Sequence, residues 1–371
     1  MDALDDPLIL IVAGWVTLVI TLAAGRLLSR SAVLPDKPNH RSSHERVTSR
    51  AGGFAICGGW FAGVVILAAF SGAPAIAQVA LAFGGLALLA FAVGYADDAW
   101  SMSSYWKFAG QLAVAALFAA AFAPLALAPA PFVGEVALGA AGVVLTVIWI
   151  VGFMNAFNFM DGANGVAAGA ACVGMCVFAV ISAFLGAPVV AGAAILLALA
   201  CFGFLPVNLA RGKLFMGDNG SQSISFIVAG LGVFAANETD GRVSALVMPV
   251  IFLPFIFDVS WTLGHRMLRK KSIVTAHREH LYQLMLRFGV SHLRVAMIYM
   301  GLTAFSSAAA IIMLALAPQW QWTVPAVLCA AFAVIAMRIH NAAMAQGFLD
   351  DKKGAPAIDA PALDPLTRAA E

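Results

Sequence analysis

Four polar side chains interrupt one apolar stretch of this 371-residue chain at a spacing of three residues: Asn155, Asn158, Asp161 and Asn164. On a helix, that spacing keeps side chains close to one face. Their oxygen atoms suit a hard cation such as Mg²⁺, and the amides could also pair with the edge of a nucleotide base. Polar groups in apolar surroundings need partners, and within a membrane they indicate a functional site. The plainer alternative is polar contact between neighbouring helices.

Two adjacent carboxylates, Asp97 and Asp98, end a second apolar stretch. Neighbouring carboxylates repel each other unless a cation or a shared proton offsets the repulsion. Lys107 opens the next apolar stretch, and its ammonium group could meet a phosphate at the same surface. Taken alone, the acids are typical of a solvated helix end and the lysine of an interfacial anchor.

A third motif, residues 215–221, places Asp218 between Gly217 and Gly220 just before another apolar stretch. The carboxylate could hold a metal ion, and backbone N–H groups at a helix start could face phosphate oxygens. Without the other motifs, an ordinary helix N-cap would be the favoured interpretation.

A fourth motif, residues 276–283, contains His277, Arg278 and His280 in a long basic loop. These side chains suit the binding of a pyrophosphate. A zinc site is less well supported, because the spacing differs from the two-histidine helix signature and no third ligand is evident. Arg50, in the first loop, adds another cation that suits phosphate.

The elements that must position these residues are helices in a membrane. Hydrophobic residues make up 62% of the chain and charged residues 11%, and the mean hydropathy is +0.92. Apolar runs of about 20 residues recur, which is the length a helix needs to cross a bilayer. The short alternating segments of a membrane β-barrel are absent. The sequence therefore predicts an all-α, polytopic helical membrane protein.

About eleven membrane-spanning helices are expected. In chain order they are residues 8–28, 53–71, 76–95, 107–128, 138–155, 165–185, 188–206, 221–236, 243–262, 295–316 and 322–341. Residues 1–341 would form one integral membrane domain. The Pro- and Ala-rich residues 342–371 would form a disordered cytoplasmic tail.

Basic residues concentrate in the loops on one side of these spans. Residues 29–52 and 263–294 carry most of them, whereas Arg242 alone lies clearly on the other side. The positive-inside rule then places the N-terminus outside and the C-terminus in the cytoplasm. All four polar motifs fall on the cytoplasmic side. A cation-coupled transporter, the alternative from another functional class, would instead place carboxylates near the middle of its spans and often show an inverted repeat.

Together the motifs resemble a known family. The acid pair at 97–98 and the segments 155–165, 215–221 and 277–280 occur in the order typical of the polyprenyl-phosphate N-acetylhexosamine-1-phosphate transferases. This is the MraY/WecA superfamily, also called glycosyltransferase family 4. The resemblance covers about residues 8–341 and includes the eleven-span layout with the N-terminus outside.

The resemblance implies transfer of a sugar-1-phosphate from a UDP-N-acetylhexosamine to undecaprenyl phosphate, with release of UMP. The cofactor would be Mg²⁺, with Mn²⁺ as a substitute. The enzyme would lie in the bacterial inner membrane, with its site facing the cytoplasm, and would start a surface polysaccharide such as O-antigen. Its partners would be the two substrates and the bilayer, without nucleic acid; a homodimer is left open.

The resemblance also implies roles for individual residues. Asn158 and Asp218 would be Mg²⁺ ligands, and Lys107 would hold a phosphate. Asp97 and Asp98 would lie beside the attacking lipid phosphate, with Asp161 as a further acid that shapes the catalytic site. The other substrate-binding residues would be Asn155, Asn164 (facing uracil), His277, Arg278, His280 and Arg50.

The chain departs from the family pattern at two places. Many members carry a third acid after the pair, where this chain has Ala99, Trp100 and Ser101, and many bacterial members have Asp at the position of Asn164. The motifs look most like those of the WbpL-type branch. The triple histidine typical of the phospho-N-acetylmuramoyl-pentapeptide transferases of peptidoglycan synthesis, the alternative within the superfamily, is missing.

Overall fold

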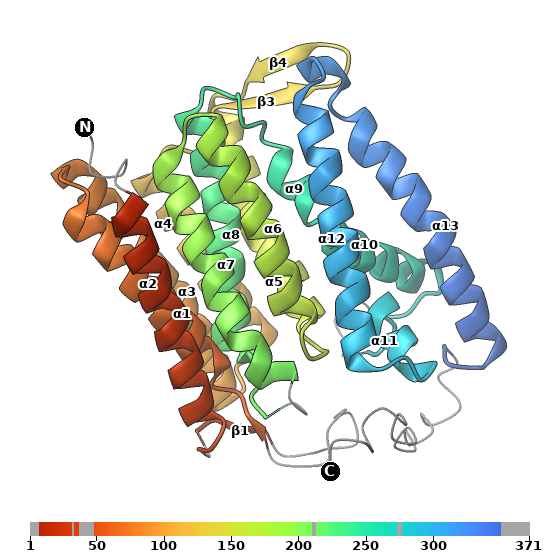
Figure 1. Ribbon diagram of the computed structural model, residues 1–371. Helices are drawn as coiled ribbons and strands as arrows, with labels where there is room; N and C mark the ends of the chain where they lie inside the picture. The colour runs from red at the N-terminus through yellow and green to blue at the C-terminus, as the bar shows by residue number, and fades with distance from the viewer. Residues whose placement is uncertain (1–6, 32, 37–47, 210–212, 273–276, 350–371) are drawn as a thin grey trace.

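The computed structural model describes residues 7–31, 33–36, 48–209, 213–272 and 277–349, and over these ranges the chain is mainly helical (Figure 1). A helix satisfies its backbone hydrogen bonds within one segment, which long apolar sequences in a membrane require. The helices are α1 (Pro7–Leu28), α2 (Gly52–Phe70), α3 (Pro74–Trp100), α4 (Ser104–Ala121), α5 (Ala140–Met160), α6 (Val166–Phe184), α7 (Pro188–Leu209), α8 (Gly217–Glu238), α9 (Val247–Ile251), α10 (Leu253–Leu268), α11 (Leu281–Arg287), α12 (His292–Leu314) and α13 (Thr323–Ala345), with a 3-10 helix at Pro318–Trp320.

Two short antiparallel hairpins add β-structure to the expected all-α fold in the described part of the chain. Strand β1 (Pro35–Asp36) pairs with β2 (Thr48–Ser49), and β3 (Leu127–Ala130) pairs with β4 (Gly134–Ala137). The β1 strand and the β3–β4 hairpin lie at opposite ends of the helix bundle (Figure 1). The all-α prediction is therefore confirmed in its main point, and the hairpins are local additions.

Nine helices among the described residues are long and apolar enough to cross a membrane: α1, α2, α3, α5, α6, α7, α8, α12 and α13 with its preceding 3-10 turn. The expected number of eleven is not confirmed by this criterion. The two expected spans that differ are residues 107–128 and 243–262.

The two differences have different causes. Helix α4 is long enough, but polar residues such as Lys107 and Gln111 lower its mean hydropathy, whereas proline interrupts the other span. Helix α4 ends at Ala121, ahead of Pro124, and the chain then enters the β3–β4 hairpin. A residue that precedes proline is disfavoured in the helical conformation. The other span divides into α9 and α10 around Phe252, because Pro254 has no N–H to donate to the carbonyl four residues earlier.

The end of the chain corrects the expected boundary of the tail. Helix α13 continues to Ala345, and Leu349 is only 1% exposed, so the predicted disordered tail does not begin at residue 342. Phe348 packs beneath the guanidinium of Arg287 at 4.3 Å, and Lys271 Nζ donates to the carbonyl of Leu349 at 2.7 Å. These contacts hold residues 346–349 against α11. The rest of the predicted tail, residues 350–371, lies outside the described residues.

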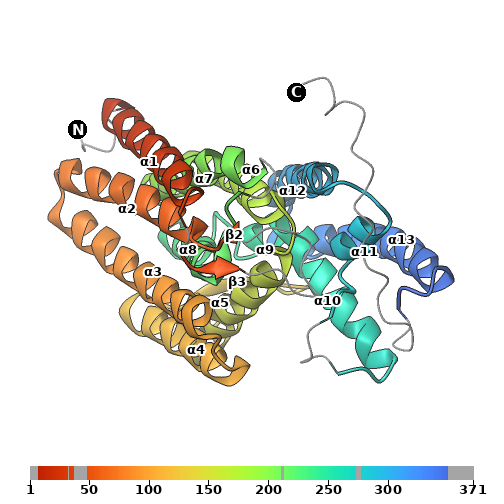
Figure 2. The same cartoon turned by 90° about the horizontal axis from the view of Figure 1, so that it is seen from below.

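Helix α8 is the central element of the bundle and packs against α2, α3, α5 and α7 (Figure 2). It is buried along most of its length although its first turns carry serine and amide side chains. Ser223 and Ser225 donate to backbone carbonyls one turn back, at 2.7 Å and 2.5 Å. These local bonds satisfy hydroxyl groups that would otherwise be costly to bury.

A short backbone pairing fixes the segment that enters α8. The Phe215 N–H donates to the Ser49 carbonyl at 2.8 Å, and the N–H groups of Gly52 and Gly53 donate to residues Phe215 and Met216 at 2.9 Å each. The start of α8 is therefore attached to the start of α2. This attachment places the third sequence motif at the same end of the bundle as Arg50.

Candidate active site

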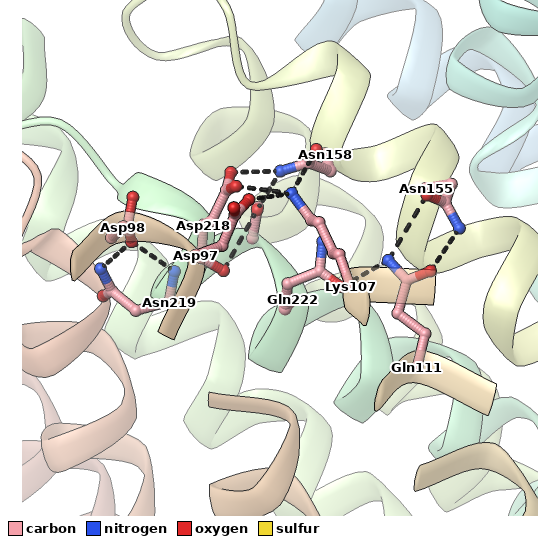
Figure 3. A network of polar contacts seen from close by, with 10 residues as sticks. Asp97, Asp98, Lys107, Gln111, Asn155, Asn158, Asp218, Asn219 and Gln222 are labelled. Carbon is pink, nitrogen blue, oxygen red and sulfur yellow. Dashed lines mark hydrogen bonds and ion pairs between the residues drawn. The ribbon is translucent and has the colours of Figure 1, made fainter. Parts of the chain in front are cut away.

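Lys107 lies among the polar residues that the sequence singled out (Figure 3). Its Nζ donates hydrogen bonds to Asp97 Oδ2 at 2.8 Å and to Asp218 Oδ2 at 2.5 Å, and it reaches Asn158 Oδ1 at 3.4 Å. Nδ2 of Asn158 donates to Asp218 Oδ1 at 2.6 Å, so its amide oxygen is left to face the lysine. Helices α3, α4, α5 and α8 thus bring together what we call the lysine cluster: Lys107, Asp97, Asn158 and Asp218.

The lysine cluster is sheltered but accessible. The side chains of Lys107, Asp97 and Asp218 are 15%, 17% and 28% exposed. Charged groups at this depth interact more strongly than they would in water, and a substrate phosphate could still reach them.

Asp98 has different contacts from its neighbour Asp97. Its Oδ2 accepts hydrogen bonds from the backbone N–H of Asn219 at 2.8 Å and from the Asn219 side chain at 2.5 Å (Figure 3). The same Asn219 amide also donates to the carbonyl of Arg50 at 2.8 Å. Asp98 therefore holds the start of α8 in place. The Arg50 guanidinium pairs with Asp36 at 2.6 Å and is partly exposed.

Helix α3 approaches α8 closely at Gly94, one turn before the acid pair. A Cβ atom at this position would overlap the backbone carbonyl of Asp218. Only a glycine lets the two helices meet at the distance that brings Asp97 to Asp218.

We expect Gly94→Ala to displace Asp218 from Asp97 and to lower kcat by about 100-fold, because misplacing a catalytic group by about 1 Å has an effect of that size. The matched control is Gly85→Ala on the same helix, where an added Cβ would meet no atom within 4 Å. Steady-state turnover of the two purified variants checks this. Equal activity of the two variants would show that the close approach is unimportant.

A second group of polar residues, the amide layer, consists of Gln111, Asn155 and Gln222 (Figure 3). Gln111 Nε2 donates to Gln222 Oε1 at 2.9 Å, and Asn155 Nδ2 donates to Gln111 Oε1 at 2.8 Å. Each residue lies about one helical turn from a member of the lysine cluster on α4, α5 or α8. Asn155, expected to bind substrate, thus contacts the other amides, and Gln111 and Gln222 are fully buried.

Gln111→Leu should leave two buried amides with fewer partners. An unsatisfied buried polar group costs about 1–3 kcal/mol, so we expect a lower midpoint of thermal unfolding and about a tenfold lower kcat. Leu112→Ala, at the adjacent and partly exposed position, is the control. An unfolding midpoint and a kcat as high as those of the control would contradict the role of the amide layer.

The turn between α5 and α6 carries Asp161 and Asn164. Gly165, in the left-handed conformation at φ +79°, begins α6, and its N–H donates to Asn208 Oδ1 at 2.6 Å. Burial and the negative charges of Asp218 and Asp98 raise the pKa of Asp161 well above its usual value. The Asn164 backbone N–H donates to His292 Nδ1 at 3.3 Å. Both expected site residues therefore lie in a turn that is attached to α7 and α12.

The segment with His277, Arg278 and His280 lies just before α11. His280 is only 3% exposed, and its Nδ1 lies 3.3 Å from Asp258 Oδ1. Burial, together with His280 and Arg266, lowers the pKa of His277 to about 4, so at neutral pH this side chain is not a cation. Both histidines were expected to bind pyrophosphate; His280 is instead buried against Asp258, and His277 could contribute only as a neutral side chain.

The donor atoms of the lysine cluster suit a hard divalent cation. Carboxylate and amide oxygens of Asp97, Asp218 and Asn158 already converge on one positively charged atom, Lys107 Nζ. Within the described ranges, no three His, Cys, Asp or Glu side chains form a ready-made metal site. Mg²⁺ commonly binds through one or two carboxylates and completes its shell with water and substrate phosphates, so this sparse donor set fits it.

Sequence reasoning missed several residues that support the site. Gln111 and Gln222 are polar side chains inside apolar stretches, which is the same signal that identified Asn155. Asn208 and Asp258 could have been found in the same way. The hydroxyl of Tyr282, which donates to the Phe159 carbonyl at 3.0 Å, has no comparable signal in the sequence.

Comparison with known proteins identifies a family and several relatives. A model described as glycosyl transferase family 4 matches residues 79–236, a range that includes the lysine cluster. A probable undecaprenyl-phosphate N-acetylglucosaminyl 1-phosphate transferase of Bacillus subtilis is 30% identical, over 85% of this chain and 88% of the relative. A decaprenyl-phosphate N-acetylglucosaminephosphotransferase of Mycobacterium tuberculosis is 33% identical, over 74% of this chain and 75% of the relative.

A more partial match is a phospho-N-acetylmuramoyl-pentapeptide-transferase of Staphylococcus epidermidis, 35% identical over 40% of this chain and 47% of the relative. The names of all three relatives describe the transfer of a sugar phosphate. The chain therefore belongs to glycosyl transferase family 4, in the MraY/WecA superfamily of membrane enzymes that transfer a sugar phosphate to a polyprenyl phosphate.

Proposed function

We propose that this enzyme transfers N-acetylhexosamine-1-phosphate from a UDP-sugar to undecaprenyl phosphate and releases UMP. The observation that carries the proposal is the lysine cluster, in which one cation and two carboxylates meet at a partly accessible point. Such a site suits a reaction between two phosphate groups, which needs charge neutralisation and positioning more than a strong base.

The reaction is a substitution at phosphorus. An oxygen of the lipid phosphate forms a bond to the β-phosphorus of the UDP-sugar, and the bond from that phosphorus to the bridging oxygen breaks. The sugar keeps its own phosphate, and UMP leaves with the bridging oxygen. A phosphate monoester is largely ionised near pH 7, so the attacking lipid phosphate does not require a proton to be removed first.

Lys107 would offset the charge of the reacting phosphates, because its ammonium is held by Asp97 and Asp218 at a point that is partly accessible. Asp97 would orient the lysine and face the lipid phosphate. Asp98 would act indirectly, since its contacts to Asn219 fix the start of α8. Mg²⁺ held by Asn158 and Asp218 would supply further charge stabilisation for the pyrophosphate.

The remaining residues would bind the nucleotide sugar. We assign Arg278 and Arg50 to its phosphates, His277 to a hydrogen bond as a neutral side chain, and Asn164 to uracil. His280 is buried, so it would act by holding the loop. Asn155 would support the site from the amide layer.

We place this site on the cytoplasmic face, with the N-terminus outside. Helix α11 lies at the end of the bundle away from the β3–β4 hairpin (Figure 1), and Arg266, near the end of α10, pairs with Glu279 just before α11. Arg50 lies beside the start of α8, which carries Asp218 of the lysine cluster, because its carbonyl accepts a hydrogen bond from Asn219. Arg242 contacts the turn at Gly186, between α6 and α7, at the end with the β3–β4 hairpin. The positive-inside rule supports this orientation, and eleven crossings follow if α4 and the α9–α10 pair also span the bilayer.

The donor is proposed to be a UDP-N-acetylhexosamine, and the product would start a surface polysaccharide such as O-antigen. The two relatives that match over most of their length are named for N-acetylglucosamine, which supports this donor class. The shorter match to a pentapeptide transferase makes a peptidoglycan precursor the second candidate.

The test is incubation of the purified enzyme with undecaprenyl phosphate, Mg²⁺ and single nucleotide sugars. The panel includes UDP-GlcNAc, other UDP-N-acetylhexosamines and UDP-N-acetylmuramoyl-pentapeptide, and mass spectrometry identifies the lipid product. A lipid pyrophosphate carrying an N-acetylhexosamine is the expected result. Reaction with the pentapeptide donor alone would assign the enzyme to peptidoglycan synthesis, and no product with any donor would refute the proposal.

A further inference from the structure

Asp258, on α10, collects hydrogen bonds from several elements although no sequence motif included it. The residue is 1% exposed. Its carboxylate accepts from the backbone N–H groups of Leu281 at 2.9 Å and Tyr282 at 3.3 Å, and from the Tyr299 hydroxyl at 2.5 Å. Nδ1 of His280 lies at 3.3 Å, and a fifth contact comes from Thr262 Oγ1 at 3.2 Å.

These five contacts fill the hydrogen-bonding capacity of the carboxylate. An ionised carboxylate is an acceptor only, with about four lone-pair sites on its two oxygens. Three of the five contacting groups belong to the consecutive residues 280–282, so Asp258 holds the chain directly after Arg278 and Glu279. The separation of 22 to 24 residues along the chain makes this a tertiary contact.

Two of the same residues also contact the end of α5. The Tyr282 hydroxyl donates to the Phe159 carbonyl at 3.0 Å, and the His280 ring stacks on the Phe159 ring with centroids 5.7 Å apart. A Cβ atom at Gly162 would overlap the Tyr282 hydroxyl, so that glycine makes room for this contact. Phe159 follows directly after Asn158 of the lysine cluster.

The structure therefore connects α10, the segment at 277–282 and the end of α5 in one chain of contacts. We propose that Asp258 is a positioning residue that holds residues 277–280 against the α5 side of the active site, in the place where the nucleotide sugar binds. This inference rests on the proposed function for the identity of the ligand. The held position itself does not depend on that function.

A purely structural role is the competing explanation, because a buried acid with five contacts also stabilises the fold. The two explanations differ in where a substitution acts. Asp258→Asn keeps the size of the side chain, but its NH₂ group cannot accept hydrogen bonds from the donors that face it. If Asp258 positions the loop, the effect should be confined to residues near 277–288 and to the binding of one substrate.

The first measurement is hydrogen–deuterium exchange of the full-length enzyme in lipid nanodiscs. In Asp258→Asn, we expect peptides covering 277–288 to exchange at least about fivefold faster while peptides of α6 and α7 stay unchanged. Ser307→Ala is the control. It also removes a buried side-chain hydrogen bond, from the Ser307 hydroxyl to the Thr303 carbonyl at 2.7 Å, but on α12 and without a contact to Asp258. Unchanged exchange at 277–288, or an equal increase throughout the protein, would overturn the inference.

The second measurement separates the two substrates. For Asp258→Asn, KM for the UDP-sugar should rise about tenfold, while KM for undecaprenyl phosphate changes less than about twofold. Tyr282→Phe, which keeps Asp258 and removes only the hydroxyl bond to Phe159, should shift KM in the same direction by about threefold. This variant keeps the inference testable if Asp258→Asn does not fold.

The outcomes distinguish this inference from the proposed function. Faster exchange at 277–288 with an unchanged KM for the UDP-sugar would refute the substrate-positioning role while the wild-type enzyme still releases UMP. Equal increases in both KM values would also refute it. A wild-type enzyme that releases no UMP would refute the proposed function, whereas the exchange result would still show whether Asp258 holds the loop.

Discussion

Asp218→Asn should lower kcat/KM for UMP release by about 10³-fold, which corresponds to roughly 4 kcal/mol of transition-state stabilisation. Asp218 accepts hydrogen bonds from Lys107 at 2.5 Å and from Asn158 at 2.6 Å, and it is one of the two proposed Mg²⁺ ligands. The amide keeps the shape of the side chain but carries no charge. The substitution therefore weakens the attraction for Mg²⁺ and removes one of the two negative charges that pair with Lys107.

Asp240→Asn is the matched control, because Asp240 is an exposed acid just beyond the far end of the same helix. Its kcat/KM should stay within about twofold of the wild type. Both variants are compared after checking that they elute as folded protein and unfold at a similar temperature. Full activity of Asp218→Asn would contradict the assignment of the metal site and, with it, the lysine cluster as the reaction centre.

Lys107→Met should lower kcat/KM by about 10²- to 10³-fold. It should also weaken the apparent binding of the lipid phosphate while strengthening that of Mg²⁺. Without the ammonium group, Asp97 and Asp218 lose the cation that lies between them. We expect a KM for undecaprenyl phosphate that is about tenfold higher, because the phosphate then meets uncompensated carboxylates. The Mg²⁺ concentration for half-maximal activity should fall by about fivefold, because a competing positive charge is gone.

Lys107→Arg is the informative comparison for this second prediction. Arginine keeps the charge but presents a planar fork, whereas the three oxygens around Lys107 converge on a single atom. Activity should therefore remain low while the Mg²⁺ requirement stays near that of the wild type. Titrations of Mg²⁺ and of lipid substrate check both variants. A Lys107→Met enzyme that needs more Mg²⁺ than the wild type would contradict the proposed electrostatics.

The residues of the lysine cluster could be predicted from sequence because each is a polar or charged residue in or beside an apolar stretch. A carboxylate, amide or ammonium group in an apolar stretch is costly unless it has partners, so such positions attract attention without any structure. The same rule applies to Gln111 and Asp258, which contact the predicted residues Asn155 and His280, and to Gln222, which contacts Gln111. Sequence reasoning was therefore incomplete at these positions although the signal was present.

The different contacts of Asp97 and Asp98 could not be read from sequence. Adjacent residues on a helix point about 100° apart, so only the position of α3 against α8 decides which acid meets Lys107. Gly94 sets that position through its contact with the Asp218 backbone. The sequence shows a glycine there but not what approaches it.

The limits of the helices were predictable only in part, for a related reason. Hydropathy locates an apolar run, but the interruption at Phe252 depends on how α9 and α10 pack after Pro254 removes one hydrogen bond. The burial of His280 similarly depends on Asp258 and Phe159, which are distant in the chain. A histidine in a basic loop is typical of an exposed ligand-binding group, and nothing local indicates the acid that orients it.

The most direct test of the central claim is whether UMP release by the purified wild-type enzyme requires both a divalent cation and the lipid acceptor. The measurement follows UMP from a UDP-N-acetylhexosamine in four reactions: complete, with EDTA, with EDTA and excess Mg²⁺, and without undecaprenyl phosphate. The account predicts release in the complete and Mg²⁺-restored reactions and none above background in the other two. UMP release that continues in EDTA, or without the lipid, would contradict it.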